Sequence, residues 1–474
     1  MKAPWRLLLS IGAFARVLNA RTTSQSLTSG GRSGWLPNNN TAIQQWVSVK
    51  ASEARSKHNG TLDPVIQAFK HAVDSRPDLA RYADQMFVEV PDKYKSPYNE
   101  TPSGTPELRN FADFLVLLDH IIHQGPDFYN KVDPPTAKDV VGFPINAALD
   151  WPMGTTAGYE FFLSSVVNDH MGRVLNHWAK YLGSAESVTV LDGWLSNLGK
   201  DTIATAGNNG KTNYTFEQLF ACPNISAPYL GFRTWDDYFV RRFNPGIRPI
   251  AAPDNGPIDP HFPNPTLVIT NACESAPLQL KHNISLSDNF FLKEQPYSLT
   301  NMLNFSPLAH NFVGGTVYQA YLSTFSYHRW HAPISGRIVK IENVAGTYYS
   351  ENLFTGLAET TSPDDSGPND SQAYISAVAT RGIIYIQARD PRIGLMAVVF
   401  IGMAEVSSCE FTVKEGEEIV KGQEIGMFHF GGSTHVMVFQ PGVELEFVEP
   451  IPKKGDFLKE KNRAVGSALA VVVS

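Results

Sequence analysis

Apolar residues recur at helical spacing through the first half of the chain. Residues 64–69, 111–118 and 158–182 each place apolar side chains three or four positions apart, which is the period of an amphipathic helix. Short segments rich in proline and glycine separate these stretches. We therefore predict a mainly helical domain over residues 35–230.

A short helix and an extended connector are expected next. Thr234 is a good helix cap, because a threonine hydroxyl can accept from a backbone N–H of the first turn. Two acidic residues follow it in that turn, where they face the positive end of the helix dipole. Residues 244–265 contain seven prolines, which is typical of an extended connector. We place the domain boundary near this point, at residues 230 and 231.

Beyond the connector the pattern changes to short strands. Apolar runs with glycine turns between them lie at residues 266–272, 317–326, 336–341, 383–388 and 396–401. Two longer segments share one rhythm of strands and glycine turns, as in a barrel built from two similar halves; these are 331–349 and 409–428. The predicted fold class is α+β, with a helical N-terminal region followed by a β-rich, barrel-sandwich-like domain over residues 231–474.

Composition narrows the class of protein. The 474 residues include 39 lysines and arginines against 46 aspartates and glutamates, a formal net charge of −7, so we expect no nucleic-acid partner. Three cysteines do not make a disulfide framework or a zinc site, and we expect no metal ion. The longest apolar run, residues 393–406, is too short to span a membrane and is interrupted by Gly402, so we predict a buried strand there.

The first 34 residues look like a leader. The first acidic residue is Glu53, whereas the 34 residues of the leader already carry five basic residues. An apolar stretch at residues 7–15 fits a secretory signal, and the arginine-bearing, acid-free composition fits a mitochondrial presequence. Eight Asn-x-Ser/Thr sequons favour the secretory route, while Arg16 and the low cysteine count oppose it. An untargeted, disordered tail on a soluble cytoplasmic protein remains the third interpretation.

Candidate chemistry centres on Gly-Gly-Ser-Thr at residues 431–434, between two apolar runs. Alone, such a motif is typical of a polar hairpin loop. However, Gly432 permits a sharp backbone bend, so that the Ser433 hydroxyl can attack the preceding carbonyl. The amide becomes an ester, the ester eliminates, and the new chain end hydrolyses to a ketone. The product is a pyruvoyl group made from Ser433, an electrophilic cofactor that can hold an amine substrate as a Schiff base.

Four segments, taken in order, resemble the phosphatidylserine decarboxylase family of pyruvoyl enzymes. They are GFRTWDDYFVRRFNPGIRP, YHRWHAPISGRIVKI, FIGMAEVSSCEFTV and KGQEIGMFHFGGST. Within that family the chain looks most like the soluble fungal branch that includes the tryptophan decarboxylase of the psilocybin pathway. The resemblance runs from about Gly34 to the C-terminus and implies cleavage between Gly432 and Ser433. It implies a large chain ending at Gly432 and a small chain, Ser433–Ser474, that stay associated because both contribute strands to one barrel.

The resemblance also implies roles for three further residues. His331 would be the base that takes the Ser433 proton during self-cleavage, and His328 would help to bind substrate and manage protons during decarboxylation. A histidine near its ordinary pKa can accept and return a proton at neutral pH. The family's processing carboxylate is usually an aspartate followed by glycine, whereas Glu274 followed by serine stands here. Glu274 would orient His331 as the third member of a triad, with a reach altered by its extra methylene.

The expected activity is therefore a self-processing, pyruvoyl-dependent decarboxylase (a carbon–carbon lyase) that needs no added cofactor. The favoured substrate is a free, aromatic, tryptophan-like L-amino acid of secondary metabolism. The alternative is conversion of phosphatidylserine to phosphatidylethanolamine. An inactive binding or scaffold protein and a serine hydrolase are rivals from other classes, although Ser433 lacks a Gly-x-Ser-x-Gly elbow. The sequence leaves open whether the protein forms a homodimer.

Overall fold

The computed structural model describes most of the chain beyond the predicted leader. The described residues are 36, 40–90, 98–99, 101–128, 141–288, 297–353, 371–405, 407–430, 433–451 and 462–473. The leader, residues 1–34, and two glycines of the predicted processing motif, Gly431 and Gly432, lie outside the described residues. No described helix is both long enough and apolar enough to cross a membrane.

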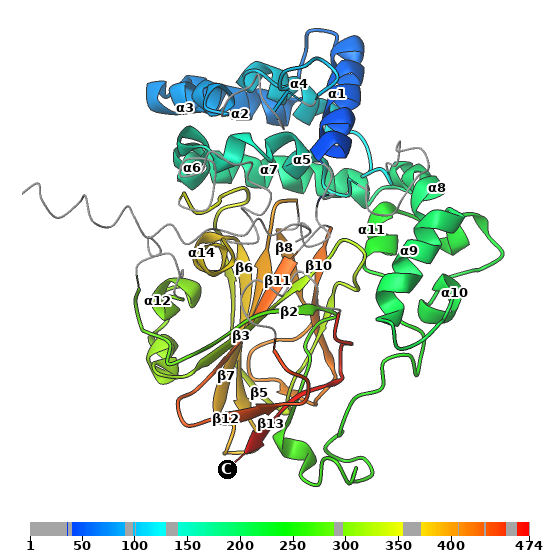
Figure 1. Cartoon of the computed structure of the whole chain (residues 1–474), viewed down its shortest axis with the longest axis vertical. Helices are drawn as coiled ribbons and strands as arrows, with labels where there is room; N and C mark the ends of the chain where they lie inside the picture. The colour runs from blue at the N-terminus through cyan, green and yellow to red at the C-terminus, as the bar shows by residue number, and fades with distance from the viewer. Residues whose placement is uncertain are drawn as a thin grey trace, which may run out of the picture. The chain divides into compact units, whose positions relative to one another are not determined.

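Helices occupy the first half of the described chain (Figure 1). The α-helices of this half are α1 (Asn40–Lys57), α2 (Pro64–Asp74), α3 (Pro77–Val88), α4 (Phe111–Ile121), α5 (Pro144–Leu149), α6 (Thr156–Leu163), α7 (Ser165–Leu182), α8 (Leu191–Trp194), α9 (Asn197–Asn208), α10 (Phe216–Leu219) and α11 (Trp235–Phe239). Short 3-10 helices lie at η3 (Pro152–Gly154), η4 (Ala185–Val190) and η5 (Pro228–Gly231). The helical period was thus a sound guide, although the predicted helix over residues 158–182 is two helices that meet at Ser164.

The helical region is held together by its apolar stripes. In α2 the buried residues Ile66, Phe69 and Val73 lie one turn apart, and the Asp63 side chain caps the helix by accepting from the backbone N–H of Val65. Phe69 meets Phe111 of α4 edge to face, with ring centroids 5.5 Å apart. The cap predicted at Thr234 is also present, because its hydroxyl accepts from Asp237 N–H at 2.9 Å.

Strands occupy the second half. They are β1 (Val268–Thr270), β2 (Ala276–His282), β3 (Thr316–Leu322), β4 (Arg329–His331), β5 (Gly336–Val344), β6 (Arg381–Ala388), β7 (Leu395–Gly402), β8 (Ser408–Phe411), β9 (Glu418–Ile419), β10 (Glu424–His429), β11 (Ser433–Phe439), β12 (Glu444–Phe447) and β13 (Ala468–Val473). Two α-helices, α12 (Leu299–Met302) and α14 (Gln372–Val378), and two 3-10 helices, η6 (Pro265–Leu267) and η7 (Pro307–Phe312), lie among them. The apolar run predicted as a buried strand is β7, all eight residues of which are buried.

The strands form three antiparallel sheets. Seven strands follow the order β2-β3-β11-β7-β6-β5-β9, three follow β4-β10-β8, and three follow β1-β13-β12. These assignments confirm the predicted α+β class. The described strands do not close into a barrel, since β2 and β9 end the seven-stranded ladder without pairing to each other. The barrel-sandwich geometry is therefore not what the described strands show.

Layers on the two faces of the seven-stranded sheet enclose the core. On one face, Trp330 of β4 stacks on Phe400 of β7 with ring centroids 3.9 Å apart, which brings the β4-β10-β8 sheet against it. On the opposite face, Arg381 of β6 donates to the carbonyls of Asn301 and Met302 in α12. Ser433 and His435 of β11 are the register partners of Gly402 and Phe400 of β7. Register partners share a face of the sheet, so Ser433 and His435 lie on the same face as Phe400, the face that Trp330 covers.

One end of the sheets lies against the helical region (Figure 1). Phe430, which follows β10, meets Trp178 of α7 at 5.0 Å and Phe143 at 6.2 Å between ring centroids. Phe430 itself has a φ of 33°, a left-handed conformation that is uncommon for a residue with a side chain. The chain therefore turns sharply just before the predicted processing motif.

Candidate active site

Ser433 begins the central strand of the largest sheet. Its register partners are Leu322 of β3 and Gly402 of β7. The side chain is fully buried, and among the described residues its hydroxyl has no hydrogen-bond partner. A buried hydroxyl without a partner costs free energy, so the position is typical of a functional group and not of a hairpin loop.

A cavity lies at the end of β7, where Gly402 is one of its lining residues. Ser433 is not itself among the lining residues, but it is the register partner of Gly402, and antiparallel partners have Cα atoms roughly 5 Å apart. The space measures about 460 Å³ including its open mouth. Its walls come from the helical region, through Phe143, Asn146 and Met153, from Ile375 and Ala379 at α14, and from residues 347–351 and 402–404.

His328 lies on the Ser433 side of the β4-β10-β8 sheet. Its carbonyl accepts from Phe428 N–H at 3.0 Å, which extends the pairing of β4 with β10 by one step. Side chains alternate along a strand, so His328 shares a face with Trp330, the residue that packs on the large sheet. The buried His328 ring stacks on Phe239, with ring centroids 4.1 Å apart, and Phe239 in turn meets Phe430 at 5.8 Å.

His331 points the other way. It is one residue beyond Trp330, so alternation directs its ring to the opposite face of β4. Its two ring nitrogens contact the Gly422 carbonyl at 2.8 Å and the Tyr327 hydroxyl at 3.0 Å. Burial lowers the pKa of His331, and the Gly422 carbonyl opposes that effect only in part. The imidazole is therefore mainly neutral at pH 7, which leaves one ring nitrogen able to accept a proton.

The His331 ring lines a second cleft, away from the Ser433 cavity. This cleft measures about 720 Å³ including its open mouth, and its charged lining residues are Arg242, Arg248 and Glu424. Both arginines are already in ion pairs: Arg242 binds Glu424 at 2.6 Å, and Arg248 binds Glu274 at 2.7 Å. The cleft walls are therefore tied together by their own charges.

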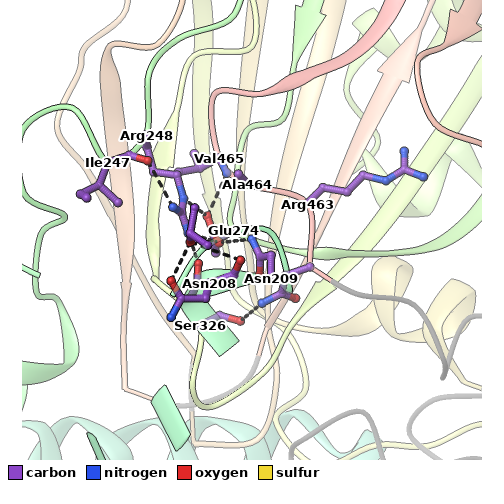
Figure 2. Close-up of polar contacts among 12 residues, drawn as sticks. Asn208, Asn209, Ile247, Arg248, Glu274, Ser326, Arg463, Ala464 and Val465 are labelled. Carbon is purple, nitrogen blue, oxygen red and sulfur yellow. Dashed lines mark hydrogen bonds and ion pairs between the residues drawn. The ribbon is translucent and has the colours of Figure 1, made fainter. Parts of the chain in front are cut away.

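Glu274 is the centre of a buried ion-pair cluster (Figure 2). The carboxylate accepts from Arg248 through two nitrogens, at 2.7 and 3.0 Å, and from Asn209 Nδ2 at 2.9 Å. Its second oxygen also accepts from the backbone N–H of Val465 at 2.9 Å. Both oxygens are thus engaged, and among the described residues no hydrogen bond joins Glu274 to His331. The structure does not bring Ser433, His331 and Glu274 together as a hydrogen-bonded triad.

Sequence reasoning overlooked His435. It lies two residues beyond Ser433, on the same face of β11, and is fully buried. Among the described residues neither of its ring nitrogens has a hydrogen-bond partner, and burial lowers its pKa to about 3. The imidazole is therefore neutral at physiological pH. The period of two along β11 is the signal that could have indicated it.

Glu405 is a further residue that the sequence did not single out. One carboxylate oxygen accepts from the backbone N–H groups of Ile145 and Asn146, at 2.6 and 2.9 Å, and so caps α5. Burial raises the pKa of Glu405 to about 7, although these backbone hydrogen bonds oppose the rise. This group ties the end of β7 to the helix whose residue Asn146 lines the cavity.

The described residues contain no group of three or more His, Cys, Asp or Glu side chains that could hold a metal ion.

Two phosphatidylserine decarboxylase family models match residues 63–203 and 235–467. The chain therefore belongs to this family, and it is a carboxy-lyase with a small-molecule substrate, an amino acid or a phospholipid.

Individual relatives point to a fungal branch of the family. The chain is 37% identical to the decarboxylase iboD of Amanita muscaria over 71% of its length and 95% of that protein. It is 32% identical to the L-tryptophan decarboxylase of Psilocybe cubensis over 90% of its length and 92% of that protein. By contrast, it is 28% identical to phosphatidylserine decarboxylase proenzyme 3 of Schizosaccharomyces pombe over 46% of its length and 20% of that protein.

Proposed function

We propose that the chain is a self-processing, pyruvoyl-dependent decarboxylase of a free aromatic, tryptophan-like L-amino acid. The observation that carries the proposal is the buried Ser433 hydroxyl, which has no described partner and whose register partner Gly402 lines the cavity. The Psilocybe cubensis relative, an L-tryptophan decarboxylase matched over 90% of this chain, supports the choice of an amino acid over a lipid.

Self-cleavage would form the cofactor from the chain itself. The Ser433 hydroxyl attacks the Gly432 carbonyl, the peptide bond becomes an ester, and the α-nitrogen of residue 433 becomes a free amine. A base then removes the α-proton, the ester C–O bond breaks, and Gly432 leaves as a carboxylate. Water replaces the nitrogen as ammonia, which leaves a ketone at position 433. A buried hydroxyl at the start of a strand, after a left-handed Phe430, suits this reaction.

During decarboxylation the resulting group would supply an electron-accepting carbonyl for the electron pair released when the carboxylate leaves as carbon dioxide. The protein must then return a proton to the substrate α-carbon. We assign this role to His328, because it is buried on the Ser433 side of β4. Burial of the site excludes bulk water, and the aromatic rings of Phe239 and Phe430 hold the imidazole in place.

The roles of His331 and Glu274 in self-cleavage remain proposals that rest on the family resemblance. Their contacts support a different contribution, because His331 is bound to Gly422 and Tyr327, while Glu274 is bound to Arg248, Asn209 and Val465. For His331 to act as the base, the ring nitrogen that contacts Tyr327 would have to give up that contact, while the other nitrogen could keep donating to the Gly422 carbonyl. The His328→Ala variant described below tests the decarboxylation role.

We propose that the processed enzyme keeps both fragments and both predicted domains. The small chain, Ser433–Ser474, would supply β11 at the centre of the large sheet. The helical domain, residues 35–230, would shape the substrate site, because Phe143, Asn146 and Met153 line the cavity. Residues 231–474 would carry the chemistry. They would form a barrel-sandwich-like scaffold, and the described strands are its open sheets.

Denaturing mass spectrometry tests the proposal directly. The wild-type protein should give a small fragment that begins at residue 433 and is lighter by one ammonia than the simple hydrolysis product. Ser433→Ala should remain one chain. His328→Ala should still cleave but lose decarboxylation by roughly a hundredfold or more, as expected for loss of a general acid. A folded wild-type chain that stays uncut would overturn the proposal in favour of a binding protein.

Phosphatidylserine is the second candidate substrate, because the family models and the Schizosaccharomyces relative carry that activity in their names. Purified, processed protein should release carbon dioxide from L-tryptophan. If the protein releases carbon dioxide from phosphatidylserine vesicles but not from L-tryptophan, the lipid replaces the amino acid as the favoured substrate.

A further inference from the structure

The cavity beside Gly402 has an unusual distribution of polar groups. Among its described lining residues, Glu351 is the one acidic side chain, and no lysine, arginine or histidine is present. Glu351 is 2% exposed, so its carboxylate lies in a region of low dielectric. Among these described lining residues a phosphate group would meet a carboxylate and no cationic side chain, which is unfavourable. The cavity is therefore suited to a neutral or cationic group.

The remaining walls are mainly apolar. Phe143, Met153, Tyr348, Ile375 and Met403 surround the space. Ligand sites commonly combine such walls with a few polar groups that fix orientation.

Tyr349 supplies an unsatisfied hydroxyl in the same wall. Its side chain is 2% exposed, and among the described residues its hydroxyl has no hydrogen-bond partner. Burial raises the pKa of Tyr349 well above its usual value, so the hydroxyl stays protonated and neutral. A buried hydroxyl without a partner is costly unless something else pairs with it. Tyr349 and Glu351 thus present a neutral hydroxyl and a carboxylate on one short stretch of the cavity wall.

We propose that this cavity is the substrate side-chain site, and that Tyr349 and Glu351 select a flat aromatic side chain carrying one N–H or O–H donor. The inference rests on the proposed amino-acid decarboxylase function and names the residues that set its specificity. The apolar walls would hold the ring, while the Glu351 carboxylate and the Tyr349 oxygen would accept from its donor. Ser433, across from Gly402, would meet the substrate amine at the other end.

Two substrates that differ in the ring donor test the assignment. L-Tryptophan carries an indole N–H, whereas L-phenylalanine has no ring donor. We expect Tyr349→Phe and Glu351→Gln each to lower kcat/KM for L-tryptophan by at least about tenfold, the effect expected for a hydrogen bond to a charged or buried group. The value for L-phenylalanine should change by less than about threefold. The matched control is Tyr385→Phe, whose hydroxyl contacts the Leu303 carbonyl on the opposite face of the large sheet.

A thermal unfolding scan separates recognition from folding. Removing a buried hydroxyl that has no protein partner should leave the midpoint of Tyr349→Phe unchanged or slightly raised. A purely structural tyrosine would instead lower the midpoint and reduce turnover of both substrates alike.

The outcomes distinguish this inference from the proposed function. If the wild type decarboxylates amino acids but both variants keep its discrimination, the cavity assignment is wrong and the function stands. Equal losses on the two substrates would also overturn the assignment. A self-cleaved wild type that turns over phosphatidylserine and neither amino acid would overturn the assignment together with the proposed substrate, while self-processing would stand.

Discussion

At the scale of single residues, the buried carboxylates are the most informative groups. Glu274 and Glu405 are both nearly inaccessible, yet they are satisfied differently. Among the described residues, Glu274 has a full set of donors led by Arg248, whereas Glu405 has two backbone donors and no cation. The free-energy cost of burying a carboxylate is therefore offset by charge pairing at Glu274. At Glu405, burial instead raises the pKa to about 7, which favours the neutral carboxylic acid.

Glu405 predicts a pH dependence of stability. Its pKa is higher in the folded protein than in the unfolded chain, so the folded state binds the proton more tightly. Its contribution to stability is therefore greatest in acid and is lost as pH rises from about 4.5 to about 7, by up to roughly 3 kcal/mol. Glu405→Gln should lose less stability than the wild type between pH 5 and pH 8, measured by urea unfolding. The exposed Glu444→Gln is the control, and parallel pH profiles for wild type and Glu405→Gln would contradict the prediction.

At the scale of elements, one contact ties α11 to the strands that lead to Ser433. His429, at the end of β10, lies 2.9 Å from Asp236 of α11 and 2.7 Å from Glu410 of β8. Burial opposes protonation of His429, but these two carboxylates outweigh it and raise its pKa above the ordinary value. The protonated imidazole thus joins three elements, four residues before the predicted processing site.

This contact should weaken in alkaline solution. Because the folded pKa is raised, the stabilisation is fully present below the ordinary histidine pKa and is lost as pH rises through the raised value. At pH 6, His429→Gln should lower the free energy of unfolding by at most about 1 kcal/mol, because the ion pairs it removes are partly exposed. At pH 9 the same change should have little effect. Asp236→Asn should behave alike. A loss that is the same at both pH values would show that the charge of His429 is not involved.

At the scale of the whole molecule, the predicted cleavage site lies at the start of β11, which is an interior strand of the large sheet and not an edge strand. Strand β11 pairs with β3 on one side and β7 on the other over all seven of its residues. Strands β12 and β13 pair with each other, and β13 with β1. The segment after residue 433 also binds Glu274 through Val465. A self-cleaved small chain would therefore be held by sheet pairing, by burial and by this ion-pair cluster.

The two fragments should behave as one particle after cleavage. In native buffer the small chain should elute with the large chain in gel filtration, and it should separate only in denaturant, because a central strand cannot leave without exposing its buried face. Glu274→Ala should weaken this association by about 1–3 kcal/mol, because it leaves the backbone N–H of Val465 in the small chain without its carboxylate partner. Urea titration of the co-eluting pair measures both effects. Elution of the small chain alone in native buffer would contradict the first expectation.

Local patterns were enough to predict much of this protein. Helical spacing indicated α2, α4 and the residues of α6 and α7, while apolar runs between glycines indicated β3, β5, β6 and β7. These features depend on neighbours in the chain, which the sequence displays directly. The ordered motifs indicated the decarboxylase family, which the family matches confirm. The sequence also singled out Ser433, whose buried hydroxyl without a described partner is consistent with the predicted chemistry.

Other features depend on contacts between residues far apart in the chain, and only the tertiary structure decided them. The spacing of His328 and His331 could not tell which ring faces Ser433, because that depends on which face of β4 packs against the large sheet. The sequence predicted Glu274 as a partner for His331. In the structure the Glu274 carboxylate accepts hydrogen bonds from Arg248, Asn209 and Val465. The cavity beside Gly402 needs walls from residues 143–153, 347–351 and 402–404, which meet only in the folded chain. The sequence determined the elements and singled out the candidate serine, Ser433, while packing of the sheets against the helices determined which side chains surround it.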